Sequence, residues 1–198
     1  MTEEVVIQRV PLWLAVAVTV LVSLSFGMFL GRYNIALWAS FIVWAEYFAL
    51  GGTPECFRHI LVPYPVGALS MAVFAAVNNY FVVSLKWNPD ASVAVWIFVW
   101  VAVAVYVMRF HEVFNKGSLP YFNGLSMYLA FYFSGLKPGF GAGPLTGNPF
   151  VDPWILWIWV VLAGVLGSVL GWFNILITFP QKGGPVNSDI RSYGTDGD

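Results

Sequence analysis

Long apolar runs separated by short polar segments are the main pattern along this chain of 198 residues. Six runs can be delimited, each close to the roughly 20 residues with which an α-helix crosses about 30 Å of hydrocarbon. Their ranges are 11–30, 33–50, 64–85, 91–108, 119–136 and 154–179. Aromatic residues near the run ends fit interfacial belts, namely Trp13, Tyr33, Tyr64, Trp87, Tyr121 and Trp154. The pattern predicts an all-α polytopic membrane protein with six transmembrane helices, of which 11–30 is an uncleaved first span.

Composition supports a membrane as the solvent of this protein. Hydrophobic residues make up 59% of the chain and charged residues 10%, and the mean hydropathy is +0.76. A soluble domain carries about 25% charged residues. The net charge of −1, with no basic patch, argues against a nucleic-acid partner. A lone cysteine, Cys56, excludes an internal disulfide and a metal site built from cysteines, and we expect no cofactor.

Six spans would place both termini on one side of the membrane, and the distribution of cations indicates which side. With the termini in the cytoplasm, more Lys and Arg residues lie inside than outside, in agreement with the positive-inside rule. The inside set is Arg9, Arg58, Arg109, Lys116, Lys182 and Arg191, and the outside set is Arg32, Lys86 and Lys137. We therefore predict a cytoplasmic N-terminus (1–10), a transmembrane domain (11–179) and a polar cytoplasmic tail (180–198).

A short internal similarity suggests that the six spans form two halves. AEYFALGG (45–52), at the end of the second run, resembles AFYFSGLKPG (130–139), at the end of the fifth. In both halves the next run contains glycines and a late asparagine, which is Asn78 or Asn79 in the first half and Asn174 in the second. Three spans per half would invert the second copy, as in many transporters with a site at the repeat interface. Because short aromatic-glycine matches also arise by chance, two inverted three-helix repeats and a chance match stay open as alternatives.

Glu46 is the residue that most needs an explanation, because the six runs contain no other Asp, Glu, Lys or Arg. A charge inside a bilayer is costly and marks a candidate functional site. Glu46 lies six residues before Gly52, about 9 Å of helix from the predicted cytoplasmic end, and its neighbours three and four residues away are apolar. Burial without a cation favours the neutral acid, which can donate a hydrogen bond.

Three polar residues on other spans fall at a similar depth and are candidate partners of Glu46, namely Ser70, Asn123 and Asn174. We predict that at least one of them faces the carboxyl group, with Asn123 and Asn174 the best placed. The cluster could bind a polar solute or a proton, or it could be a structural hydrogen bond between helices. Asn78 and Asn79 lie in the outer half of the third span, where they could line a vestibule, although we favour polar contacts between helices.

Other features indicate packing rather than chemistry. Gly164, Gly167, Ser168 and Gly171 share one face of the sixth span, which allows another helix to approach closely. The glycine-rich segment 139–147 lacks the Lys-Ser/Thr ending of a phosphate-binding loop. We find no nucleophile–base pair and no metal-spaced cluster, so the sequence does not predict an enzyme.

Two aromatic-glycine stretches resemble a known family. The first begins at Trp38 and continues through WAEYFALGG (44–52) to a span that opens with Gly67, and the second is PYFNG (120–124) leading into YFSG (132–135). Both are similar to stretches in the small bacterial inner-membrane proteins of domain-of-unknown-function family 1097, over roughly residues 27–171. The resemblance implies an integral inner-membrane protein and leaves its biochemistry open. The chain departs from the family pattern in its longer 137–153 loop and its polar tail.

These observations lead to two functional hypotheses. The first is a channel or secondary transporter for a small polar solute, with a site in the inner half of the membrane around Glu46, Asn123 and Asn174 and with Ser70 and Asn78 as further candidate binding residues. Six spans make a thin bundle to enclose a pathway, so we expect a homo-oligomer surrounded by membrane lipid. The alternative is a non-transporting scaffold or accessory subunit that docks a partner through the long outer loop and the tail.

Overall fold

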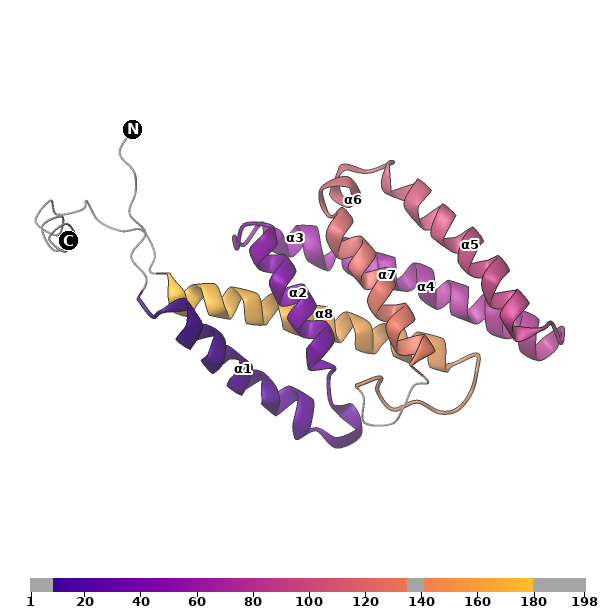
Figure 1. Cartoon of the computed structure of the whole chain (residues 1–198), viewed down its shortest axis with the longest axis horizontal. Helices are drawn as coiled ribbons and strands as arrows, with labels where there is room; N and C mark the ends of the chain where they lie inside the picture. Colours follow the sequence, from indigo (N-terminus) through magenta and orange to yellow (C-terminus); the bar gives the residue numbers. More distant parts are fainter. Residues whose placement is uncertain (1–8, 135–140, 180–198) are drawn as a thin grey trace, which may run out of the picture.

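The computed structural model describes residues 9–134 and 141–179, and all regular structure in these ranges is helical (Figure 1). The longer helices are α1 (Leu12–Met28), α2 (Leu37–Ala49), α4 (Pro63–Asn79), α5 (Pro89–Met108), α7 (Ser118–Phe133) and α8 (Asp152–Thr178). The short elements are a 3-10 turn (Gly31–Tyr33), α3 (Cys56–Leu61), a π-helical turn (Tyr80–Ser84) and α6 (Glu112–Lys116). Most of the predicted N-terminal segment, all of the predicted tail and part of the 137–153 loop lie outside the described residues.

Helix lengths establish fewer full spans than the sequence predicts. Among the described residues, three helices are long and apolar enough to cross a membrane: Cys56–Ser84, Pro89–Met108 and Asp152–Thr178. α1 is apolar but has 17 residues, α7 has 16 and α2 only 13, which is about 20 Å of helix for α2. The predicted start of the second span at residue 33 is wrong. Asn34 Oδ1 accepts a hydrogen bond from Leu30 N (2.8 Å) and closes a turn, so that helix α2 begins only at Leu37.

The connections gather at the two ends of an elongated bundle. The described ends of the chain, the short helices α3 and α6 and the turn after α2 lie at one end, and the α1–α2 and α4–α5 connections and residues 141–151 lie at the other (Figure 1). α4 packs most extensively against α7, and α2 against α8. α5 packs mainly against α4 and leaves much of its surface uncovered, including Phe98, which is 76% exposed.

α4 and α7 run in parallel and cross through a reciprocal pair of glycines. A methyl group added at Gly67 would collide with the carbonyl oxygen of Tyr121, and one added at Gly124 would collide with the carbonyl oxygen of Tyr64. The two crossing points carry the same pattern, PYPVG (63–67) in α4 and PYFNG (120–124) in α7. Only glycine at both positions allows the two backbones to approach this closely.

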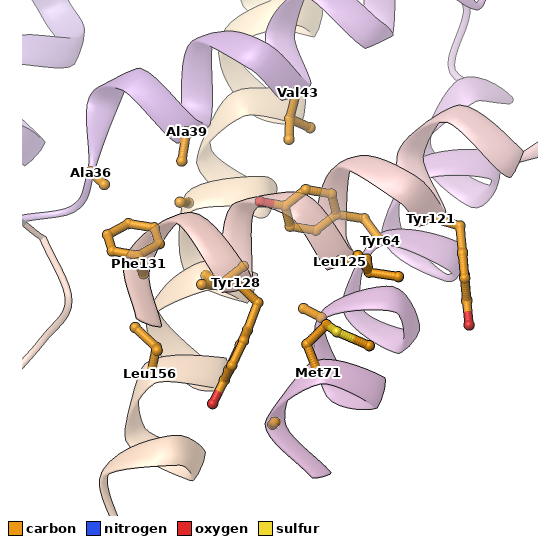
Figure 2. Close-up of a cluster of buried hydrophobic side chains, with 14 of the residues drawn as sticks. Ala36, Ala39, Val43, Tyr64, Met71, Tyr121, Leu125, Tyr128, Phe131 and Leu156 are labelled. Atoms are coloured by element: carbon orange, nitrogen blue, oxygen red, sulfur yellow. The ribbon is translucent and has the colours of Figure 1, made fainter. Parts of the chain in front are cut away.

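The small-residue stripe of α8 is a packing surface, as the sequence predicts. Gly167 faces the carbonyl oxygen of Ser40, Gly171 faces the side chain of Tyr47, and Gly164 faces the ring of Tyr64. The largest buried side chains fill the space between α2, α4, α7 and α8 (Figure 2). The core at this level includes Val43, Tyr64, Met71, Tyr128, Phe131 and Leu156.

Candidate functional site

Glu46 lies in the last turn of α2 and is buried, with 2% of its surface exposed. The turn that ends α2 fixes its depth. Gly52 N donates to Tyr47 O and Gly51 N to Phe48 O, both at 2.9 Å, which is the Schellman arrangement. Gly51 and Gly52 have φ of +105° and +66°, values that favour glycine, so the glycine pair of the sequence stops the helix just beyond the carboxylate.

Asn123 is the partner of Glu46. Its Nδ2 donates a hydrogen bond to Glu46 Oε1, joining α7 to α2. Asn123 precedes Gly124, so the same helix crossing that brings α7 against α4 also directs this amide toward α2. The structure thus brings together one of the three predicted partners.

The second carboxyl oxygen of Glu46 is unpaired. Oε2 is buried and has no hydrogen-bond partner among the described residues. The ion pair that the described residues do contain is Lys116–Glu112 (2.5 Å), an exposed contact within α6 rather than one in the bundle. Among the described residues, Glu46 therefore has one satisfied and one unpaired acceptor, both buried, which is costly unless a proton or a ligand occupies the unpaired position.

A tyrosine from another helix, Tyr64, lies near Glu46, and sequence analysis missed it. Tyr64 is 1% exposed, and its hydroxyl interacts electrostatically with Glu46 but has no hydrogen-bond partner among the described residues. Figure 2 shows its ring in the core, with Val43 of α2 above it. Tyr47, beside Glu46 in the chain, is fully buried and its hydroxyl is likewise unpaired in the described part of the protein.

The assignment of Tyr64 and Tyr121 to interfacial belts is wrong. Tyr121 is 2% exposed and its hydroxyl donates to Ala104 O (3.2 Å). The repeated Pro-Tyr-x-x-Gly pattern is the signal that could have placed both residues at a helix crossing instead.

Asn174 belongs to a different contact. It is buried in α8, and its Nδ2 donates to Thr19 Oγ1 of α1 (3.2 Å), whereas its Oδ1 has no partner among the described residues. Thr19 Oγ1 in turn donates to Ala15 O (2.8 Å). Asn174 therefore ties α1 to α8 and does not face Glu46.

Thr19→Val should loosen α1 with little effect on the rest of the bundle. The substitution keeps the side-chain shape but removes the acceptor for Asn174, at an expected cost of about 1 kcal/mol. Hydrogen exchange should accelerate in α1 amides while α4 and α7 amides stay protected. Val18→Thr, an exposed neighbour on α1, is the matched control. Equal protection of α1 in the Thr19 variant and the wild type would contradict this role.

The remaining predicted residues lie away from Glu46. Ser70 Oγ donates to Gly67 O within α4 (2.7 Å). Asn78 Nδ2 donates to the Tyr132 hydroxyl (3.3 Å), which donates to Asn79 Oδ1 (2.8 Å), so one tyrosine of α7 contacts both asparagines. Asn79 Nδ2 also donates to Pro149 O (2.6 Å). This network joins α4, α7 and the 141–151 segment, in agreement with the polar-contact interpretation.

The comparisons with known proteins bear on the family of the chain. A family model described as "Protein of unknown function (DUF1097)" matches residues 15–178. The chain belongs to the DUF1097 family. The matched range contains both aromatic-glycine stretches and every residue of the Glu46 site, so the resemblance noted in the sequence is confirmed. No curated protein and no solved structure matches this DUF1097 chain.

Proposed function

We propose that this DUF1097 protein is a channel or secondary transporter for a small polar solute, with Glu46 as the binding group. The observation that carries the proposal is the half-satisfied carboxyl group, in which Asn123 holds one oxygen and the buried second oxygen is free among the described residues. A purely structural hydrogen bond between helices does not require an acid, because an amide pair would serve at lower cost.

The chemistry of the site favours a solute that carries hydrogen-bond donors. Oε2 of Glu46 can accept a bond from an amine, amide or hydroxyl group, or it can take up a proton. The hydroxyl of Tyr64, which has no partner in the described part of the chain, can donate to or accept from the same molecule. Asn123 holds the carboxyl group in a fixed orientation, so binding and release change the occupancy of one oxygen while the helix contact is kept.

For the membrane topology, we propose six crossings with both termini in the cytoplasm of an inner-membrane protein. Most of the described cations lie at the end of the bundle with α3 and α6, namely Arg9, Arg58, Arg109 and Lys116. The other end carries two of the described cations, Arg32 and Lys86, so the positive-inside rule favours the α3 and α6 end as the cytoplasmic one. The short helix α2 can cross because non-helical backbone is tolerated at membrane depth where protein covers it. Gly141 packs against the backbone of Ala36 at the start of α2, and Ala36 is buried.

We further propose that α1, α2 and α4 form one half of an inverted repeat and α5, α7 and α8 the other. In this assignment α2 corresponds to α7 and α8 corresponds to α4, so the α2–α8 contact corresponds to the α7–α4 contact. Both contacts are extensive, join parallel helices and are mediated by glycine. The Glu46–Asn123 hydrogen bond would then lie at the interface between the halves, where transporters of this class bind their substrates.

The uncovered face of α5 is the surface through which we propose that the protein assembles into homo-oligomers.

The test is solute flux into proteoliposomes. Wild-type protein should transport at least one member of a panel of small amines, amides, polyols and amino acids. Glu46→Gln should reduce this flux about tenfold or more, because the amide nitrogen that replaces Oε2 can neither accept a hydrogen bond nor take up a proton. Glu55→Gln, an exposed carboxylate at the start of α3, is the matched control and should transport normally.

Two outcomes would contradict the proposal. Flux that is equal in the wild type and in Glu46→Gln would remove Glu46 from the pathway. A folded wild-type protein that transports no member of the panel, and that copurifies from membranes with a stoichiometric second protein, would favour the scaffold function instead.

A further inference from the structure

A hollow lies at the end of the bundle that carries α3 and α6. It lies between the turn after α2 and the last turns of α8, and its volume is about 260 Å³. Its walls are mainly apolar and come from Tyr47, Gly52, Pro54, Trp172, Ile175, Leu176 and Phe179. The lining contains no Asp, Glu, Lys or Arg, so the hollow suits a hydrocarbon rather than a polar solute.

Exposed apolar side chains of α8 border the hollow. Trp172 and Leu176 are 42% and 45% exposed, and they continue an uncovered apolar row formed by Val165 and Val169. Trp172 is six residues before the last residue of α8, about 9 Å of helix. α8 is long and apolar enough to cross a membrane. If it does, a hollow at its last turns lies where the headgroups meet the acyl chains.

The backbone of a cationic residue, Arg9, lies beside one wall of the hollow. Arg9 N donates to Thr178 O (2.8 Å), which fixes Arg9 next to Phe179, one of the wall residues. Its side chain is exposed, and no carboxylate among the described residues pairs with it. A cation at the membrane surface attracts anionic headgroups, so Arg9 and the neighbouring hollow together match the two parts of one amphiphile.

We propose that this site binds an anionic glycerophospholipid, with one acyl chain in the hollow and the phosphate group at Arg9. The turn at Gly52 makes the space. Its positive φ (+66°) places the backbone over Ile175, and even a methyl group there would come within 3.1 Å of Ile175 Cδ1. Gly52 therefore has two roles, since it helps to end α2 beyond Glu46 and forms part of the wall of the hollow.

The first experiment measures lipid retention by native mass spectrometry of the full-length protein in detergent. The probes are phosphatidylglycerol and phosphatidylethanolamine with identical acyl chains. The wild type should retain phosphatidylglycerol about fivefold more strongly, the factor that corresponds to one cation near an anionic surface. Arg9→Gln should abolish this preference, and Ile175→Trp, which fills the hollow, should abolish retention of both lipids.

Matched controls separate the site from general lipid binding. Arg32→Gln removes an exposed cation at the opposite end of the bundle, and Leu162→Trp adds the same bulk on an exposed position of α8 away from the hollow. Both should retain lipid as the wild type does. Equal loss in Arg32→Gln and Arg9→Gln, or undiminished retention in Ile175→Trp, would overturn the proposal.

A second measurement uses the wild-type protein alone, so it does not require that any variant fold correctly. Phosphatidylglycerol with a photoreactive group near the end of one acyl chain should label residues 47–54 and 172–179. Labelling of the uncovered α5 face alone, or labelling by a free fatty acid with equal efficiency, would overturn the assignment of an anionic phospholipid. Neither readout involves solute flux, so these results stand apart from the transport proposal.

Discussion

Gly124→Ala should destabilise the protein, although alanine is the better helix former by about 1 kcal/mol. The added methyl group would collide with the carbonyl oxygen of Tyr64, and a rigid backbone cannot move aside as a side chain can. Overpacking of this kind costs about 1–3 kcal/mol or more, and here it would separate α7 from α4, the most extensive helix contact in the fold. The thermal unfolding midpoint in detergent, followed by tryptophan fluorescence, should fall by several degrees.

Further variants test whether the clash at the α4–α7 crossing causes the lower unfolding midpoint. Ser126→Ala, on the exposed face of α7, should leave the midpoint unchanged. Gly67→Ala should resemble Gly124→Ala because the collision is reciprocal, and the double variant should lose less than the sum of the two, since one separation of the helices relieves both clashes. An additive double variant, or an unchanged midpoint in Gly124→Ala, would contradict the crossing as described.

The hydrophobic pattern predicted the helices well because it needs only local information. Each apolar run contains one longer helix, and glycine at positions 51 and 52 predicted the end of α2 correctly. The hydrophobic pattern could not locate the start of α2, because the residues before it are apolar enough to belong to the same helix, namely Tyr33, Ile35 and Ala36. A turn closed by the Asn34 side chain decides the boundary instead.

The partner of Glu46 shows the limit of reasoning from depth. Asn123 and Asn174 lie at similar predicted depths, yet Asn123 reaches Glu46 and Asn174 reaches Thr19. The choice depends on the rotation of α7 and α8 about their axes, which is fixed by the contacts of Gly124 and Gly167 with neighbouring backbones. A sequence read without its helix crossings carries no such information.

Tyr64 shows that hydropathy cannot distinguish an interfacial side chain from a buried one. A tyrosine near the end of an apolar run has the same hydropathy whether it lies at the lipid interface or in the core. Trp13 and Trp154, 72% and 41% exposed, fit the belt assignment, whereas Tyr64 is buried beside Glu46. Helix packing thus adds a hydroxyl to the candidate site that composition alone assigned to the membrane surface.

Asn123→Leu should be among the most destabilising single substitutions in the bundle. It would leave the buried carboxyl group of Glu46 with neither oxygen paired among the described residues, at an expected cost of about 1–3 kcal/mol. Glu46→Met should cost less, because Asn123 is only half-buried and its amide can find another partner. The free energy of unfolding of both variants can be measured by denaturant titration in detergent micelles.

The double variant Glu46→Met/Asn123→Leu separates the structural role of this pair from its functional role. Replacing both partners by apolar groups of similar shape is close to neutral, so the double variant should recover the stability that Asn123→Leu loses. The coupling energy from the cycle should be about 1–2 kcal/mol. Solute flux should nevertheless stay abolished, because the group proposed to bind the solute is gone. A double variant that regains both stability and flux would show that Glu46 serves helix packing alone.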